Sequence, residues 1–203
     1  MKVKICGITT KEAAQEAVRS GADFIGFVFA RSKREVTKEQ AAEIAKVIPA
    51  SVKKVGVFVN ESQEVIEEIV QTVGLDYIQL HGDESPEFCN SFRKPVIKAF
   101  HVKEKDDLLA IQNYQCAYYL LDSPAGKYRG GNGEKFDWSL AKDISFFDGK
   151  IILAGGLHAD NVQEAIREVN PAGIDVSSGV ETNGEKDLAK INIFIQKAKQ
   201  IEG

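Results

Sequence analysis

Short runs of β-branched and aromatic residues alternate with amphipathic helical patterns along the whole chain. Eight runs have the length and composition of buried strands, and they cover residues 2–6, 23–29, 53–59, 76–80, 96–100, 117–122, 150–153 and 173–176. Successive runs begin roughly 20 to 33 residues apart, which is enough chain for a strand, a helix and two connections. The pattern predicts eight βα units in series, in one domain over residues 1–203.

Helix-start signals occupy the segments between these runs. The sequences "TTKE" at residues 9–12 and "TKEQ" at residues 37–40 have capping-box spacing. Asn60 is placed to cap a third helix, and Ser85 precedes a proline at the first position of a fourth. Further helices are expected at residues 106–113, 138–144, 161–169 and 187–201. The third helix should bury Val65, Ile66, Ile69, Val70 and Val73, and the last one Leu188, Ile191, Ile195 and Ala198.

Two architectures accommodate eight such units, a closed (β/α)8 TIM barrel and an open doubly wound sheet. The count of eight favours the barrel, and no GxGxxG turn follows the first strand, as a dinucleotide-binding sheet requires. At 203 residues the chain is shorter than the ~250 residues typical of the barrel, so we expect a compact, single-domain version. Active sites of these barrels lie at the C-terminal strand ends, which confines the search for chemistry to eight short segments.

Composition narrows the class of protein. The chain is 43% hydrophobic with a formal net charge of -4, which does not indicate a nucleic-acid surface. No run reaches the ~18 apolar residues of a membrane span, and no secretory signal is recognisable. The three cysteines are too widely spaced for a CxxC pair, and no cysteine and histidine cluster has zinc-ligand spacing. We therefore expect a cytoplasmic protein.

Small residues follow the last two predicted strands. Gly155 and Gly156 permit a ligand to approach the backbone closely, and Ser177, Ser178 and Gly179 add two hydroxyl groups at the neighbouring strand end. Barrels commonly bind phosphate between these two loops, where a short extra helix can begin. A phosphate site is one interpretation of these residues, and ordinary turn glycines are the other.

Cys6 is the last residue of the first predicted strand. The helix expected to begin near Thr9 would stabilise a thiolate through its dipole, and Lys4 lies on the same face of the strand. Cys6 is therefore either a base or nucleophile, or a small buried hydrophobe. Cys89 and Cys116 have no polar company and are expected to be inert.

Four further polar residues follow strand ends. Asp122 is either a loop cap or a general acid directed into the barrel mouth. Arg34 belongs to a basic cluster that is either solvated or holds a carboxylate through two hydrogen bonds. His81 can donate to a substrate oxygen or to the backbone, and Asp175 can bind sugar hydroxyls or pair with Lys4.

Six segments, taken in order, resemble one family closely. They are "KICGIT", "GFVFARSKR", "QLHGDE", "LLDS" followed by "GGNGEKFDW", "LAGGL" with "NV" downstream, and "GIDVSSGVE". They cover nearly the whole chain, and the first and last together are highly specific. The chain is similar to the phosphoribosylanthranilate isomerase family, the (β/α)8 enzymes of tryptophan biosynthesis.

This resemblance implies an Amadori rearrangement of N-(5'-phosphoribosyl)anthranilate to 1-(2-carboxyphenylamino)-1-deoxy-ribulose 5-phosphate. It implies that Cys6 is the general base, that Asp122 is the general acid and that Arg34 holds the anthranilate carboxylate. His81 and Asp175 correspond to positions that line the pocket. The phosphate site corresponds to Gly155, Gly156, Ser177, Ser178 and Gly179.

The implied reaction needs neither a metal nor an organic cofactor, because the nitrogen of the substrate accepts the electrons. The expected partner is a small phosphosugar substrate, without nucleic acid or membrane, and the protein is expected to be a monomer or a homodimer. The chain departs from the family pattern at Asn132 and Glu134, where a hydroxyl residue and a lysine are expected, and at Lys33, where proline is expected.

Two alternatives to this isomerase stay open on the sequence. One is another phosphosugar isomerase barrel, such as the histidine-pathway aminoaldose isomerase, although that enzyme uses an aspartate where this chain has Cys6. The other is a phospholigand-binding barrel without catalytic activity.

Overall fold

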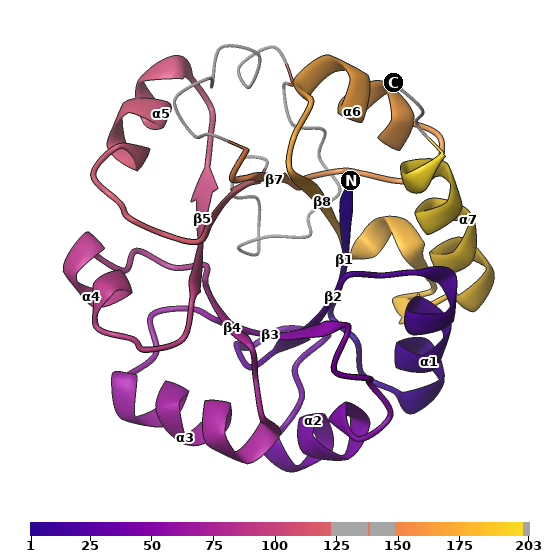
Figure 1. The fold of residues 1–203 in the computed structure, drawn as a ribbon, viewed down its shortest axis with the longest axis horizontal. Helices are drawn as coiled ribbons and strands as arrows, with labels where there is room; N and C mark the ends of the chain where they lie inside the picture. The colour runs from indigo at the N-terminus through magenta and orange to yellow at the C-terminus, as the bar shows by residue number, and fades with distance from the viewer. Residues whose placement is uncertain (123–137, 139–148, 201–203) are drawn as a thin grey trace.

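Eight parallel strands close into a barrel in which each strand pairs with its sequence neighbour and β8 pairs with β1 (Figure 1). The computed structural model describes residues 1–122, 138 and 149–200. The strands are β1 (Lys2–Cys6), β2 (Phe24–Val28), β3 (Lys53–Phe58), β4 (Tyr77–Leu80), β5 (Val96–His101), β6 (Tyr118–Asp122), β7 (Ile151–Leu153) and β8 (Gly173–Val176). The predicted (β/α)8 barrel is confirmed, and all eight strands lie where the hydrophobic pattern placed them.

A ring of helices surrounds the barrel (Figure 1). They are α1 (Lys11–Ser20), α2 (Lys38–Ala45), α3 (Gln63–Val73), α4 (Pro86–Asn90), α5 (Lys105–Ile111), α6 (Val162–Val169) and α7 (Leu188–Lys199). After β8 the chain adds a 3-10 helix, η3 (Ser178–Val180), and the short pair β9 (Glu181–Thr182) and β10 (Glu185–Lys186). The helix predicted at residues 138–144 lies outside the described residues, apart from Trp138. No helix in the described part of the chain is both long enough and apolar enough to cross a membrane.

Side-chain caps set where several helices begin. Thr37 caps α2 in the predicted capping box, and Ser85 caps α4 ahead of its proline, also as predicted. The capping box predicted at residues 9–12 is wrong, because Thr10 caps α1 and the residue three positions later, Ala13, has no side chain that can reciprocate. The first two connections of the barrel therefore follow local sequence chemistry closely.

The cap predicted at Asn60 is wrong. Ser62 caps α3 instead, and Asn60 has a φ of 51°, a left-handed conformation that asparagine tolerates better than most residues. The side-chain oxygen of Asn60 accepts a hydrogen bond from the Asp83 amide at 2.7 Å. Asn60 therefore ties the end of β3 to the loop after β4.

Two apolar residues predicted to be buried are exposed. Val65 is 38% exposed and Leu188 is 41% exposed, and both lie in the first turn of their helices. The buried faces consist of Ile66, Ile69, Val70 and Val73 in α3 and of Ile191, Phe194, Ile195 and Ala198 in α7. The packed stripe is therefore narrower at the start of each helix than the apolar pattern predicts.

Two-residue alternation along the strands separates two cores. Outward side chains pack against the helices, whereas the barrel interior is filled by Phe24, Val55, Ile97, Ala99, Leu120, Ile152 and Ala154. Beyond this apolar filling, toward the C-terminal strand ends, buried positions become polar and include Lys4, Gln79 and Asp175. Because buried polar groups cost stability unless they are paired, this polar layer indicates where the site lies.

Candidate active site

A cavity of about 740 Å³ opens at the C-terminal strand ends, a volume suited to a small organic ligand. Nine of the ten predicted catalytic and binding residues line this cavity: Cys6, Arg34, His81, Asp122, Gly155, Gly156, Asp175, Ser177 and Ser178. The lining also includes the apolar residues Val28, Phe29 and Val57. The cavity thus combines charged groups with a surface that accepts a planar apolar group.

Cys6 occupies the last position of β1 and is 7% exposed. Lys4 lies two residues earlier on the same face, and its Nζ pairs with Oδ1 of Asp175 at 2.9 Å. A Cβ on Gly26 of the neighbouring strand would lie 3.0 Å from the Cys6 sulfur and 3.1 Å from Lys4 Nζ. The absence of a side chain at Gly26 therefore leaves the room that the thiol and the ammonium group occupy. Of the two roles considered for Asp175, the structure shows the pairing with Lys4.

The strand ends after Cys6 because Gly7 has a φ of 76°, a conformation that favours glycine. A Cβ at Gly7 would lie 2.5 Å from Cδ of Arg34. Gly7 therefore turns the chain and also lets the Arg34 side chain pass over the end of β1.

Burial raises the pKa of the Cys6 thiol, and the Asp175 carboxylate raises it further, while Lys4 and Lys186 act in the opposite direction. The thiolate stabilisation expected from the helix after β1 is outweighed, so the resting form is the neutral thiol. Burial opposes the charge on Lys4, but Asp175 and Cys6 outweigh burial and leave the pKa of Lys4 raised. Lys4 therefore keeps its positive charge beside the sulfur.

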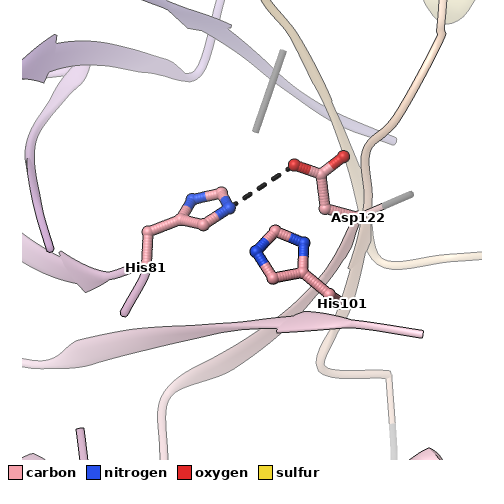
Figure 2. A group of neighbouring side chains, drawn as sticks. All are labelled: His81, His101 and Asp122. Carbon is pink, nitrogen blue, oxygen red and sulfur yellow. Dashed lines mark ion pairs between the residues drawn. The ribbon is translucent and has the colours of Figure 1, made fainter. Parts of the chain in front are cut away.

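Asp122 ends β6 and is 4% exposed. Oδ2 of Asp122 lies 3.4 Å from Nε2 of His81, which follows β4 (Figure 2). His101, the last residue of β5, is the strand partner of Asp122, and its ring lies 5.4 Å from that of His81 between centroids. The carboxyl group therefore faces two imidazoles at the mouth of the barrel.

The loop after β4 holds His81 in place. The buried ammonium of Lys98 donates to the carbonyls of Leu80 and Gly82 at 3.4 and 2.9 Å. Glu84 pairs with Lys98 at 3.3 Å and accepts hydrogen bonds from the Gly82 amide. Because Leu80 and Gly82, on either side of His81, are both held by these buried contacts, the backbone of His81 has little freedom.

The nominated phosphate residues gather after β7 and β8. Gly155 and Gly156 have φ values of 80° and 64°, and the Gly156 carbonyl accepts a hydrogen bond from Asn161 at 2.9 Å. Ser177 and Ser178 enter η3, the short extra helix expected at this place. Two adjacent loops of small residues therefore border one corner of the cavity, an arrangement suited to an oxyanion.

Gly179 does not line the cavity. A Cβ there would lie 1.9 Å from the Leu157 carbonyl oxygen, so the residue lets η3 pack directly on the loop after β7. Gly179 thereby supports the oxyanion corner from behind, whereas the sequence nominated it as a contact residue.

A partly buried ion network connects Arg34 with the β9–β10 pair. The Nε and Nη2 atoms of Arg34 donate to the two carboxylate oxygens of Glu181 at 2.6 and 2.9 Å. Lys186 also pairs with Glu181 and donates to the Ser177 carbonyl at 3.0 Å. The two-bond grip on a carboxylate that the sequence suggested for Arg34 is thus made, in this structure, to Glu181.

This network shifts the pKa values of its members. Hydrogen bonding to Glu181 raises the pKa of Arg34. Burial alone would raise the pKa of Glu181, but hydrogen bonds from Arg34 and Lys186 outweigh it and lower that pKa. Burial lowers the pKa of Lys186 despite its partner. Glu181 is therefore ionised at neutral pH and holds two cations at the edge of the cavity.

Cys89 and Cys116 are buried outside the cavity lining. The sequence predicted no polar neighbours for them, but the two thiols form a hydrogen bond with each other. Hydrogen bonding with Cys116 and burial raise the pKa of Cys89. Both remain free thiols.

Sequence reasoning missed His101, Glu181 and Lys186. His101 was overlooked because the fifth strand was expected to end one residue earlier. The Arg34–Glu181 contact joins residues 147 positions apart, and no local pattern signals it. Only Glu181 was visible in advance, as part of the quoted segment "GIDVSSGVE".

The chain is similar over its full length to known proteins. The family model for N-(5'phosphoribosyl)anthranilate (PRA) isomerase matches residues 3–197. A Listeria welshimeri protein named N-(5'-phosphoribosyl)anthranilate isomerase is 53% identical over 202 residues, with 100% of each chain covered. The crystal structure of phosphoribosyl anthranilate isomerase from Thermotoga maritima has a TM-score of 0.92 and 43% identity, covering 99% of this chain and 100% of that one. A second crystal structure of such an isomerase, in complex with reduced 1-(o-carboxyphenylamino)-1-deoxyribulose 5-phosphate, has a TM-score of 0.89 and 42% identity with the same coverage.

Proposed function

The chain belongs to the N-(5'-phosphoribosyl)anthranilate isomerase family, and we propose that it rearranges its substrate with Cys6 as the general base and Asp122 as the general acid. The enzyme is an aldose-ketose isomerase of tryptophan biosynthesis, and its substrate is a small phosphosugar. The observation that carries the proposed roles is that a thiol and a carboxyl group, from opposite halves of the sequence, open on one cavity beside two glycine- and serine-rich loops.

The carboxyl group of Asp122 suits the first proton transfer. Opening the ribose ring requires a proton on the ring oxygen as its bond to C1' breaks, and the anthranilate nitrogen then forms an iminium ion. Asp122 is nearly buried, so few waters compete for its proton. General acids of this type typically contribute ~100- to 10,000-fold in rate.

The Cys6 thiolate suits the second transfer. The iminium ion makes the C2' proton acidic, and the sulfur removes it to give an enolamine. Loss of the proton on the C2' oxygen and protonation of C1' then give the ketone and return both groups to their starting states. The substrate nitrogen serves as the electron sink, so no step requires a metal or organic cofactor. Lys4 supplies the positive charge that favours the thiolate as it forms.

The ends of the cavity suit the ends of the substrate. The corner made by Gly155, Gly156, Ser177 and Ser178 can hold the phosphate. Arg34 can hold the anthranilate carboxylate with the nitrogen that Glu181 leaves available, while the apolar lining residues can receive the aromatic ring. Fixing both ends orients the sugar between sulfur and carboxyl group, an effect that can supply several kcal/mol of the barrier. His81 and Asp175 also line the cavity and can contact the sugar hydroxyls.

Further features of the enzyme stay expectations. We expect residues 1–203 to form one domain, acting as a monomer or a homodimer in the cytoplasm, without a nucleic-acid or membrane partner. Asn132 and Glu134 lie outside the described residues.

A kinetic test separates the two catalytic roles from binding. Loss of substrate fluorescence reports turnover, and calorimetry with a reduced product analogue reports binding. Cys6→Ala and Asp122→Asn are expected to lower kcat at least about 100-fold with little change in analogue affinity. Cys89→Ala and Asp160→Asn are the matched controls, since one is a buried thiol away from the cavity and the other an exposed carboxyl group. Full turnover in either catalytic variant would remove that residue from the mechanism.

A further inference from the structure

Three potential metal ligands converge where strands β4, β5 and β6 end. One ligand atom each from His81, His101 and Asp122 lies within 4.8 Å of the other two (Figure 2). No local pattern in the sequence predicts this group, because its members are about 20 residues apart and show no zinc-ligand spacing. Closure of the barrel brings them together, since neighbouring strands lie about 4.8 Å apart.

The donor set is that of a divalent transition-metal site. Two imidazoles and one carboxylate are the protein ligands of many open zinc centres, which keep a fourth position for water. Bonds of about 2.0 to 2.1 Å in a tetrahedron separate ligand atoms by about 3.3 Å. The 3.4 Å between His81 Nε2 and Asp122 Oδ2 already has this value, and His101 lies within reach of small side-chain rotations. The cavity on which His81 and Asp122 open supplies space for the remaining ligand.

Gln79 contacts the ring nitrogen of His81 that faces away from Asp122. Its side-chain amide nitrogen lies 3.1 Å from Nδ1 of His81, and Nε2 is directed at Asp122. Rotation of this amide by half a turn would let its oxygen accept the Nδ1 proton and leave Nε2 with a lone pair for a cation. In the present orientation that oxygen is buried and has no hydrogen-bond partner among the described residues, so the rotation breaks no hydrogen bond of the oxygen.

The site is rigid on two sides. His81 is fixed by the Lys98 and Glu84 contacts to its loop, and its own amide donates to the Phe58 carbonyl at 2.8 Å. His101 and Asp122 are paired residues within the sheet. Ligands held on strand ends lose little conformational entropy when a cation binds.

We propose that His81, His101 and Asp122 bind a divalent transition-metal cation of the zinc class, and that the bound cation inhibits the isomerase. The inhibition rests on the proposed role of Asp122: coordination requires the carboxylate, and a coordinated carboxylate has no proton to give to the ring oxygen. The cation is an inhibitor here and takes no part in the rearrangement.

Cobalt(II) and zinc(II) are the probes, in a buffer without phosphate and about one unit above the usual histidine pKa of ~6.5. Visible absorption on cobalt addition, and calorimetry with zinc, report binding without reference to activity. The wild-type protein is expected to bind one equivalent of cobalt(II) with no thiolate-to-cobalt charge-transfer band. Zinc is expected to reduce turnover over the same concentrations at which it binds, and a chelator is expected to restore it.

Two histidine variants form the matched pair. His101→Asn is expected to weaken metal affinity at least about 10-fold, and the effect of zinc on its turnover is measured against the variant's own turnover in chelator. His158→Asn should leave the affinity unchanged, since His158 is exposed and lies in the loop after β7. Far-ultraviolet circular dichroism checks that His101→Asn is folded, and His101→Gln provides a second substitution at the same position.

Equal metal affinity in wild type and both His101 variants would overturn the site, as would a charge-transfer band that disappears in Cys6→Ala. Binding that depends on His101 but leaves turnover unchanged would support the site and overturn the inhibitory role of Asp122 coordination. Loss of turnover in Asp122→Asn, measured in chelator, tests the catalytic proposal separately.

Discussion

Gly26→Ala should damage catalysis more than stability, because the added methyl group points at the reacting sulfur. Its Cβ would lie 3.0 Å from Cys6 Sγ and 3.1 Å from both Cys6 Cα and Lys4 Nζ. Ordinary contact begins at 3.4 Å, so the sulfur or the β1 backbone must move by about 0.4 Å, the difference between 3.4 and 3.0 Å. A misplacement of a reacting group by 1 Å can lower the rate about 100-fold. If the logarithm of the rate falls in proportion to the displacement, a shift of 0.4 Å lowers the rate about 6-fold. We expect kcat to fall about 5- to 10-fold.

Gly56→Ala is the control on the adjacent strand. Gly56 pairs with Phe27 next to Gly26, but its Cβ would lie 2.4 Å from Cδ1 of Leu75, in the layer between barrel and helices. That overlap should cost about 1–3 kcal/mol of unfolding free energy and lower Tm by roughly 2–4 °C per kcal/mol, with kcat unchanged. Substrate fluorescence gives kcat, and thermal unfolding gives Tm for both variants. The reasoning fails if Gly26→Ala keeps kcat within about 2-fold of wild type, or if Gly56→Ala loses as much activity.

Three further predictions address binding, pH and packing. Glu181→Gln should raise KM more than it lowers kcat, because Arg34 loses the partner that orients it. The pKa of Glu181 is lowered in the folded protein, so the stability that Glu181 contributes is complete above the usual glutamate pKa of ~4.3 and is lost as pH falls through the folded pKa. The variant should therefore show a weaker dependence of unfolding on acid. Because the pKa of the Cys6 thiol is raised, log(kcat/KM) should increase with a slope near one as pH rises through neutrality, and a profile that is flat between about pH 6 and pH 8 would contradict Cys6 as the base. Gly179→Ala should raise KM about 10-fold or more with a smaller change in kcat, because its Cβ overlaps the Leu157 carbonyl behind the phosphate corner; an unchanged KM would show that this packing does not support binding.

Much of the barrel can be predicted from the sequence alone. Strand positions follow from short runs of β-branched and aromatic residues, and several helix starts follow from caps such as Thr37 and Ser85, because both signals act between residues only a few positions apart. The candidate residues follow from the same logic. Once eight βα units are recognised, the fold itself assigns chemistry to the C-terminal strand ends. The quoted segments then identify the family without any coordinates.

Tertiary structure alone decided which charged groups meet. The sequence offered Asp175 a choice between sugar hydroxyls and Lys4, and the closed barrel pairs it with Lys4 across 171 residues of chain. The family resemblance implied that Arg34 binds a substrate carboxylate, whereas in this structure it donates two hydrogen bonds to the Glu181 carboxylate.

The state of Cys6 also required the fold, because burial is a property of the whole molecule. The sequence showed a helix start nearby that would favour the thiolate, whereas desolvation in the packed barrel favours the thiol. Short-range propensity determines where strands and helices form, since it acts between neighbours along the chain. The protonation of buried groups, and pairings such as that of His81 with Asp122, arise only when distant segments exclude water together.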